Sequence, residues 1–156
     1  MTDAYTLVKL LHILSSTVLF GTGIGTAFQM LMAARDGRPE VVARVAAQVV
    51  WADWWFTTPA VVVQPVSGLA LVHLAGYSLG EPWLLASLAL YAVAGAAWLP
   101  VVVIQRRLRD LAETAAAAGL PLSQAWRRLF RLWFLLGWPG FGAVVGIFAL
   151  MVIRPG

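Results

Sequence analysis

The sequence predicts an all-α integral membrane protein, a four-helix bundle with both termini on the same side of the membrane. Of its 156 residues, 61% are hydrophobic and 12% are charged, which is about half the charged fraction of a soluble domain. Four long apolar stretches alternate with short polar segments, and each is long enough for the roughly 20 residues that cross a bilayer. We therefore expect one four-span transmembrane domain over residues 1–156.

The first span is predicted over about 5–34. It ends where Arg35-Asp36-Gly37-Arg38-Pro39 combines charge with a helix-ending glycine and with a proline that can begin the next helix. Residues 40–53 mix valine and alanine with polar side chains, so we expect a cytoplasmic helical extension there. The second span follows over about 54–77 and contains two prolines, and we expect a kink near Gln64-Pro65.

The third span is predicted over about 83–104, because Ser78-Leu79-Gly80-Glu81-Pro82 forms a short turn between antiparallel spans. A second cytoplasmic extension is expected over about 105–124, where Gly119 and Pro121 close the helix. The fourth span runs over about 129–153 and completes the bundle.

The cations predict the orientation. Nine of the eleven fall beside the first and third connections, namely Arg35, Arg38, Arg44, Arg106, Arg107, Arg109, Arg127, Arg128 and Arg131. Because short cytoplasmic segments are enriched in Lys and Arg, this side is predicted to be cytoplasmic and both termini periplasmic. In so apolar a chain, the net charge of +4 indicates membrane orientation and lipid contact, and we expect no nucleic-acid partner.

Two histidines inside the spans are the main candidates for chemistry, because the chain has no cysteine and ionisable groups are costly within a membrane. His12 lies early in span one and His73 lies late in span two, so both are expected at similar depth in the outer leaflet. Two imidazoles on facing helices can bind the two axial positions of a haem iron. Lys9 and Tyr77, one helical turn away, can contact the propionates. The alternative is that hydroxyls such as Ser15 satisfy the rings.

Two other polar residues have structural and functional interpretations. Asp53 lies among tryptophans near the cytoplasmic interface, where an ion pair with Arg44 or Arg131 is expected and a proton relay is the alternative. Gln64 is expected to bond the carbonyl that Pro65 leaves free, the alternative being contact with a quinone or a porphyrin edge.

Glycines four residues apart occur twice in the spans. Gly21 and Gly25 form one pair, and Gly142 and Gly146 form the other. This spacing lets helix backbones approach closely, so we expect helix packing within one chain or between protomers of a homo-oligomer.

Four short motifs carry a resemblance to known families. They are Lys9-Leu10-Leu11-His12, Asp53-Trp54-Trp55-Phe56, Trp98-Leu99-Pro100 and Arg131-Leu132-Trp133-Phe134. Together they resemble the uncharacterised bacterial integral membrane family called domain of unknown function 2269, over nearly the whole chain. More distantly, Lys9 and His12 resemble the start of HemJ-type protoporphyrinogen oxidases and CopD-like membrane proteins, in which an early histidine is a proposed haem ligand.

The leading hypothesis is therefore a haem b protein of the bacterial inner membrane, with His12 and His73 as ligands of the haem iron and Lys9 and Tyr77 beside the propionates. It would transfer electrons to or from a quinone, a periplasmic redox partner or a porphyrin-like substrate, and the resemblance implies a possible HemJ-like oxidoreductase. The alternative is a cofactor-free transporter component or assembly partner that oligomerises through its glycine faces.

Overall fold

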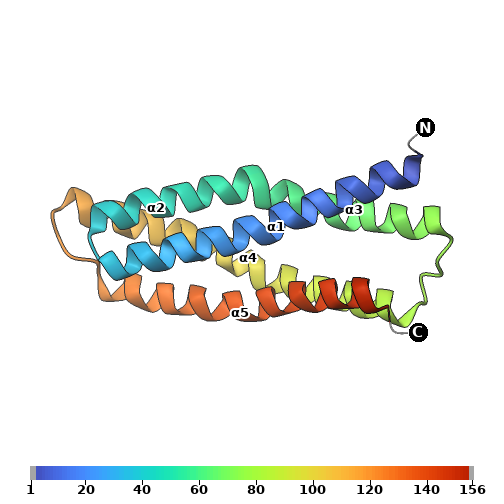
Figure 1. Ribbon diagram of the computed structural model, residues 1–156. Coiled ribbons are helices and arrows are strands. Elements are labelled where there is room, and N and C mark those ends of the chain that lie inside the picture. The colour runs from blue at the N-terminus through green and yellow to red at the C-terminus, as the bar shows by residue number, and fades with distance from the viewer. Residues whose placement is uncertain (1–2, 155–156) are drawn as a thin grey trace.

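The computed structural model describes residues 3–154, which form four long helical rods and, within that range, no strand. The rods are antiparallel neighbours, and both ends of the chain emerge at the same end of the bundle (Figure 1). Each rod is long and apolar enough to cross a membrane, so the predicted all-α four-span class is confirmed. The helices are α1 (Ala4–Asp36), α2 (Pro39–Ala52), η1 (Asp53–Thr57), α3 (Thr58–Ala75), α4 (Pro82–Ala117) and α5 (Gln124–Ile153).

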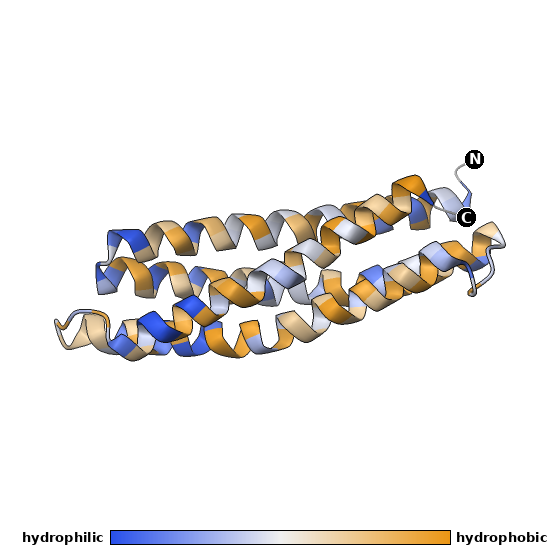
Figure 2. Ribbon diagram, turned by 90° about the horizontal axis from the view of Figure 1, so that it is seen from below, coloured by the Kyte–Doolittle hydropathy of each residue, from blue (hydrophilic) through white to orange (hydrophobic). Residues whose placement is uncertain are grey.

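Three of these elements form one rod, because α2, η1 and α3 follow one another without a break. α4 packs against α5 and α2, and α1 packs against α2 and α3. α1 also meets α5 through aromatic rings, since Phe20 lies 4.9 Å from Phe141 and 5.5 Å from Phe148 between ring centroids. Hydrophilic residues gather at the end that holds the first and third connections (Figure 2).

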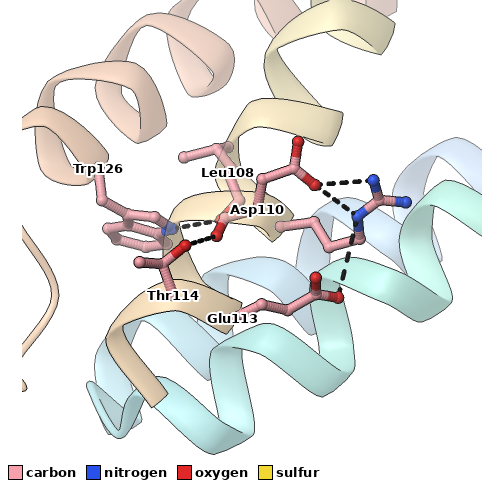
Figure 3. Close-up of polar contacts among 6 residues, drawn as sticks. Leu108, Asp110, Glu113, Thr114 and Trp126 are labelled. Atoms are coloured by element: carbon pink, nitrogen blue, oxygen red, sulfur yellow. Dashed lines mark hydrogen bonds and ion pairs between the residues drawn. The ribbon is translucent and has the colours of Figure 1, made fainter. Parts of the chain in front are cut away.

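The tightest packing lies at this hydrophilic end. Met30, Val42 and Leu108 are buried there in one cluster with Trp126. The indole Nε1 of Trp126 donates to the carbonyl oxygen of Leu108 at 3.1 Å, and this bond ties α5 to α4 (Figure 3). Because the indole is 3% exposed, the bond also satisfies a donor that has no access to water.

The helix ends follow from local sequence. The Asp3 carboxylate caps α1 by accepting from the amide of Thr6 at 2.8 Å, and this bond lowers the pKa of Asp3. Gly37 and Gly119 adopt left-handed φ values of 75° and 63° after α1 and α4, a conformation that glycine adopts at little cost. The helix after residue 105 ends at Ala117, just before Gly119, the predicted helix-closing glycine, and a turn and a loop over 118–123 occupy the rest of the predicted extension.

A single π turn, η1, interrupts the second rod and was not predicted. The Thr58 amide donates to the carbonyl of Asp53, five residues earlier, and the Thr58 hydroxyl donates to the same oxygen at 2.9 Å. Asp53 and Thr57 are buried, whereas the three aromatic residues between them are exposed. The π turn therefore directs two polar side chains into the bundle and shifts the residues that follow by one position around the rod.

The second rod also contains Pro65, which has no amide N–H to donate to the carbonyl of Val61 four residues earlier. The hydroxyl of Tyr91, on α4, donates to that carbonyl instead. The predicted role of Gln64 at this position was wrong: its side-chain amide donates across to α1, to the carbonyl of His12 at 2.8 Å. A neighbouring helix thus satisfies the backbone that the proline leaves open.

This arrangement predicts a conditional effect of Tyr91→Phe. Removing the hydroxyl leaves the Val61 carbonyl unpaired in an apolar interior, which costs about 1–3 kcal/mol. In a Pro65→Ala background the new amide supplies the missing donor, so the same substitution should cost less. The measurement is the free energy of unfolding in mixed micelles for the wild type, both single variants and the double variant. Equal costs in the two backgrounds would contradict the assignment.

Candidate functional site

His12 lies on the face of α1 that meets α3. Its ring nitrogen Nδ1 is 2.8 Å from the hydroxyl oxygen of Ser67. That hydroxyl donates its own proton to the carbonyl of Val63, at 2.6 Å, within its helix. Since the hydroxyl proton is used there, Ser67 accepts from Nδ1–H, and neutral His12 carries its free lone pair on Nε2.

A small polar cluster surrounds this histidine and joins the two helices. Gln64 donates from its amide nitrogen to the His12 carbonyl and, at 2.6 Å, to the hydroxyl of Ser15. Gly68 makes room for the ring, because a Cβ at that position would lie 3.2 Å from Cε1 of His12. The ring is therefore held in one orientation by Ser67 and by close backbone approach.

His73 does not share this face of α3. It is exposed, and it follows Gly68 by five residues, which corresponds to about 7.5 Å along the helix and about 140° around it. Gly68 and Ser67 face α1, so the Cβ of His73 points away from the side that meets His12. The structure therefore brings His12 to Ser67 and Gln64 and leaves His73 outside the cluster.

Lys9 and Tyr77 lie near the same end of the bundle in separate surroundings. The Lys9 ammonium lies 5.8 Å from the centroid of the Tyr5 ring. The Tyr77 hydroxyl accepts from Nη1 of Arg154 at 2.6 Å, and the Arg154 guanidinium also lies over the Tyr77 and Trp83 rings. Arg154 is thus a second cation at this end of the bundle, beside Lys9.

A cavity, here called the central cavity, lies elsewhere, among all four rods. It has a volume of about 400 Å³ and is lined mostly by apolar and aromatic side chains. The sequence analysis did not predict it. The polar side chains in its wall come from three rods: Thr26 from α1, Asp53 and Thr57 from the π turn, and Tyr91 and Gln105 from α4, joined by the indoles of Trp98 and Trp133. Its size suits a small lipophilic molecule.

Three buried polar atoms of this wall have no hydrogen-bond partner among residues 3–154: Oδ2 of Asp53, Nε1 of Trp98 and Nε1 of Trp133. The other carboxylate oxygen of Asp53 accepts from the Thr57 hydroxyl at 2.8 Å. Buried polar groups are nearly always paired, so an unpaired set of an acceptor and two donors in one cavity requires an explanation.

The predicted ion pair of Asp53 with Arg44 or Arg131 was wrong. Asp53 is 8% exposed, whereas both arginines are exposed, and in the described part of the chain no ion pair includes Asp53. The π turn directs the carboxylate inward, while the long arginine side chains extend toward the polar end. The carboxyl group is therefore buried without a counter-charge.

Contacts between the antiparallel helices α4 and α5 show how far along the bundle each polar side chain of the cavity lies. Trp126 bonds to Leu108, and Gly140 packs against Ala97, so Trp133 lies at about the level of residues 102–103, between Trp98 and Gln105. The Gln105 side chain lies beside the Asp53 carboxyl group and is a candidate donor to it, although Oδ2 of Asp53 has no partner of hydrogen-bond geometry among the described residues. Trp98 is about two turns from Gln105 along α4. The cavity thus has its acid at the Gln105 end, with Trp133 and then Trp98 farther along an otherwise apolar wall.

The cavity reaches the surface of the bundle between α1 and α5. Ile24, Phe134 and Trp138 line it and are also 51%, 38% and 65% exposed. These residues are in the middle of spanning helices, so the opening faces the hydrocarbon region of the membrane. A ligand can therefore enter from the bilayer without passing through water.

The glycines of the two predicted pairs differ in how closely other helices approach them. A Cβ on Gly146 would lie 2.9 Å from Cδ1 of Leu90, so this glycine allows close packing of α5 on α4. Within the described residues, nothing lies within 4 Å of such an atom on Gly21 or Gly25. A Cβ on Gly142 would likewise meet nothing within 4 Å in this part of the chain, so Gly146 alone of the four glycines serves close helix packing, and Gly21 and Gly25 form an open face of α1.

Comparison with known proteins agrees with this architecture. A family model described as predicted integral membrane protein (DUF2269) matches residues 6–155. No curated protein and no solved structure shows significant similarity to the chain. Since the matched region covers almost the whole bundle, including the π turn and both clusters of polar residues, the chain belongs to the predicted integral membrane protein family of domain of unknown function 2269.

Proposed function

We propose that the protein binds a lipophilic molecule with a hydrogen-bonding head group inside the central cavity. The observation that carries the proposal is the set of three unpaired buried atoms on Asp53, Trp98 and Trp133 in one cavity. Each such atom costs about 1–3 kcal/mol when buried without a partner. A ligand that pairs with them recovers this cost, so the site selects for the complementary head group.

The chemistry of the wall defines that head group. Asp53 accepts a hydrogen bond when it is ionised, and the two indoles only donate. The complement is a group that both donates and accepts, such as the hydroxyl of a phenol or quinol. The apolar part of the ligand would fill the rest of the cavity, and a longer tail would extend into the bilayer through the opening at Ile24 and Trp138. A membrane quinol, the reduced form of a quinone, meets these requirements, which makes a quinol lipid the preferred natural ligand class.

The proposal predicts that 4-octylphenol binds at least about tenfold more tightly than octylbenzene, because a tenfold difference corresponds to about 1.4 kcal/mol and one hydrogen bond to a buried group supplies that much. The measurement is an NMR titration of the tryptophan indole N–H signals in lipid nanodiscs. Trp98→Phe and Trp133→Phe assign the two signals of interest. The phenol should shift the Trp133 signal, and octylbenzene should not.

Asp53→Leu is the informative variant, because it removes the acceptor and keeps an apolar side chain of similar size. It should abolish the advantage of octylphenol while octylbenzene still binds. Trp54→Phe changes an aromatic residue that is 60% exposed and outside the cavity wall, so it should leave both affinities unchanged. If neither compound perturbs Trp98 or Trp133, the cavity is not a ligand site and the proposal fails.

A second candidate function is haem b binding at His12. The observation that favours it is the hydrogen bond from Nδ1 to Ser67, since metal-ligating histidines usually donate their other ring N–H to a neighbouring acceptor. The exposed position of His73 does not fit a second axial ligand on the same iron, so His12 would bind alone. Lys9 and Arg154 are the cations nearest to this end for the propionates. Haem b would supply one-electron redox chemistry.

This candidate predicts a Soret band in protein purified after expression with added haem, with sharper bands on reduction by dithionite. His12→Ala should abolish the spectrum and His73→Ala should retain it. If the wild type shows no band, although a cooperative thermal denaturation curve demonstrates that it is folded, haem binding is excluded. Loss of the spectrum in both variants would instead favour ligation by the two histidines that the sequence analysis proposed.

We also propose that the protein resides in the bacterial inner membrane with its termini in the periplasm, on the basis of the nine arginines at the opposite end. The chain has no cysteine, so single-cysteine variants report topology directly. In intact cells, a membrane-impermeant maleimide should label Ser78→Cys, beside the turn near the termini. It should not label Gln124→Cys until the cells are broken. The reverse pattern would invert the proposed orientation.

A further inference from the structure

A second cavity, the arginine groove, lies at the hydrophilic end between the last turns of α1 and the first turns of α5. It has a volume of about 440 Å³. Three arginines line it, namely Arg35 on α1 and Arg127 and Arg131 on α5. The remaining wall is apolar and aromatic, with Leu31, Trp126 and Phe130 contributing side chains. The groove thus combines a cationic rim with an apolar floor.

These three arginines have no acidic partner among residues 3–154. The carboxylates at this end pair elsewhere: Asp36 binds Arg38 at 2.7 Å, and Asp110 binds Arg109 at 2.7 Å. Arg127 and Arg131 are four residues apart on one helical face, a spacing at which like charges destabilise a helix. The groove therefore has three arginines in its wall without an ion-pair partner among these residues, and a bound anion would reduce the repulsion between them.

The floor of the groove is rigid. The rings of Trp126 and Phe130 are stacked, with centroids 5.2 Å apart and planes 8° from parallel. Trp126 is also bonded to the Leu108 carbonyl, at the core between α4 and α5 (Figure 3). An apolar floor beside the cations favours a ligand that has an acyl chain as well as an anionic group, because a free phosphate ion would leave the aromatic surface exposed to water.

We infer that the arginine groove binds the head group of an anionic phospholipid, with guanidinium groups on the phosphate oxygens and an acyl chain along Leu31 and Phe130. Guanidinium groups match phosphate geometry through paired N–H donors, and basic pockets between membrane helices suit lipid head groups. Three cations favour cardiolipin, which has two phosphates, over phosphatidylglycerol, which has one. This inference does not depend on a ligand in the central cavity.

The test is native mass spectrometry of the full-length protein released from nanodiscs that contain cardiolipin, phosphatidylglycerol and phosphatidylcholine in equal amounts. We expect cardiolipin to be retained at least about tenfold more than phosphatidylcholine, with phosphatidylglycerol in between. The triple variant Arg35→Gln, Arg127→Gln, Arg131→Gln should lose this preference. The matched control Arg106→Gln, Arg107→Gln, Arg128→Gln removes the same charge from exposed residues outside the groove and should keep it.

Several outcomes would overturn the inference. Equal loss in both triple variants would mean that lipid binding follows net charge and not the groove. Displacement of cardiolipin by millimolar inorganic phosphate would assign the site to the free ion, and retention of a second protein copy in place of lipid would assign it to an oligomer interface. If the groove triple variant does not fold, Arg127→Gln and Arg131→Gln are measured singly, and each should give a partial loss.

Discussion

The structure depends on one constraint: within hydrocarbon, each backbone and side-chain polar group must find its partner inside the bundle. The Val61 carbonyl shows how strictly this applies. Pro65 removes its helical donor, and among residues 3–154 a tyrosine hydroxyl from α4 takes the place of that donor. The same constraint explains why the Ser67 hydroxyl donates to a carbonyl of its own helix and accepts from Nδ1 of His12. The hydroxyl proton, the hydroxyl oxygen and the Nδ1 proton are all used in hydrogen bonds.

Against this background, the unpaired atoms of the central cavity are exceptional. The bundle pairs Nδ1 of His12, the amide of Gln64 and the hydroxyl of Tyr91, yet Asp53, Trp98 and Trp133 each keep one buried polar atom without a hydrogen-bond partner among the described residues in the wall of one cavity. The π turn is part of the cause, because it directs Asp53 inward while Trp54 and Trp55 stay outside. π turns are often found at functional sites, and here the extra residue directs the acid into the cavity.

Much of the architecture could be predicted from the sequence. Hydropathy and length gave four spans, and helix-ending residues such as Gly37 gave the first connection. The candidate site was less predictable, because the position of a residue along a helix gives its depth in the membrane but not the direction in which its side chain points. The sequence predicts His12 and His73 at similar depth. However, Ser67 and Gly68, the α3 residues that meet His12, lie a third of a turn or more around that helix from His73. Which face of α3 meets α1 follows from packing and is not visible in composition.

The central cavity was missed for a related reason. Its wall comes from four rods, and no single stretch of sequence contains its pattern. One signal was available: Trp98 lies six residues, or about 9 Å, inside the predicted inner end of its span, although tryptophans in membrane helices favour the interfaces. An indole within a span lacks water to accept its N–H, so it indicates either an internal partner or a ligand. Asp53 gave a weaker signal, because the sequence placed it just outside the second span, where water or an arginine could pair with it.

The separation of charge in the bundle links the two cavities. Nine arginines lie at the hydrophilic end of the bundle. Asp53 lies in the same half, yet among the described residues no ion pair joins it to any of them. An arginine on Asp53 would satisfy the carboxylate and fill the Gln105 end of the central cavity. The arginines instead extend outward, and three of them line the second groove. The carboxylate inside and the three arginines of the groove thus each lack an ion-pair partner among residues 3–154, and each offers a charge to a molecule other than the protein.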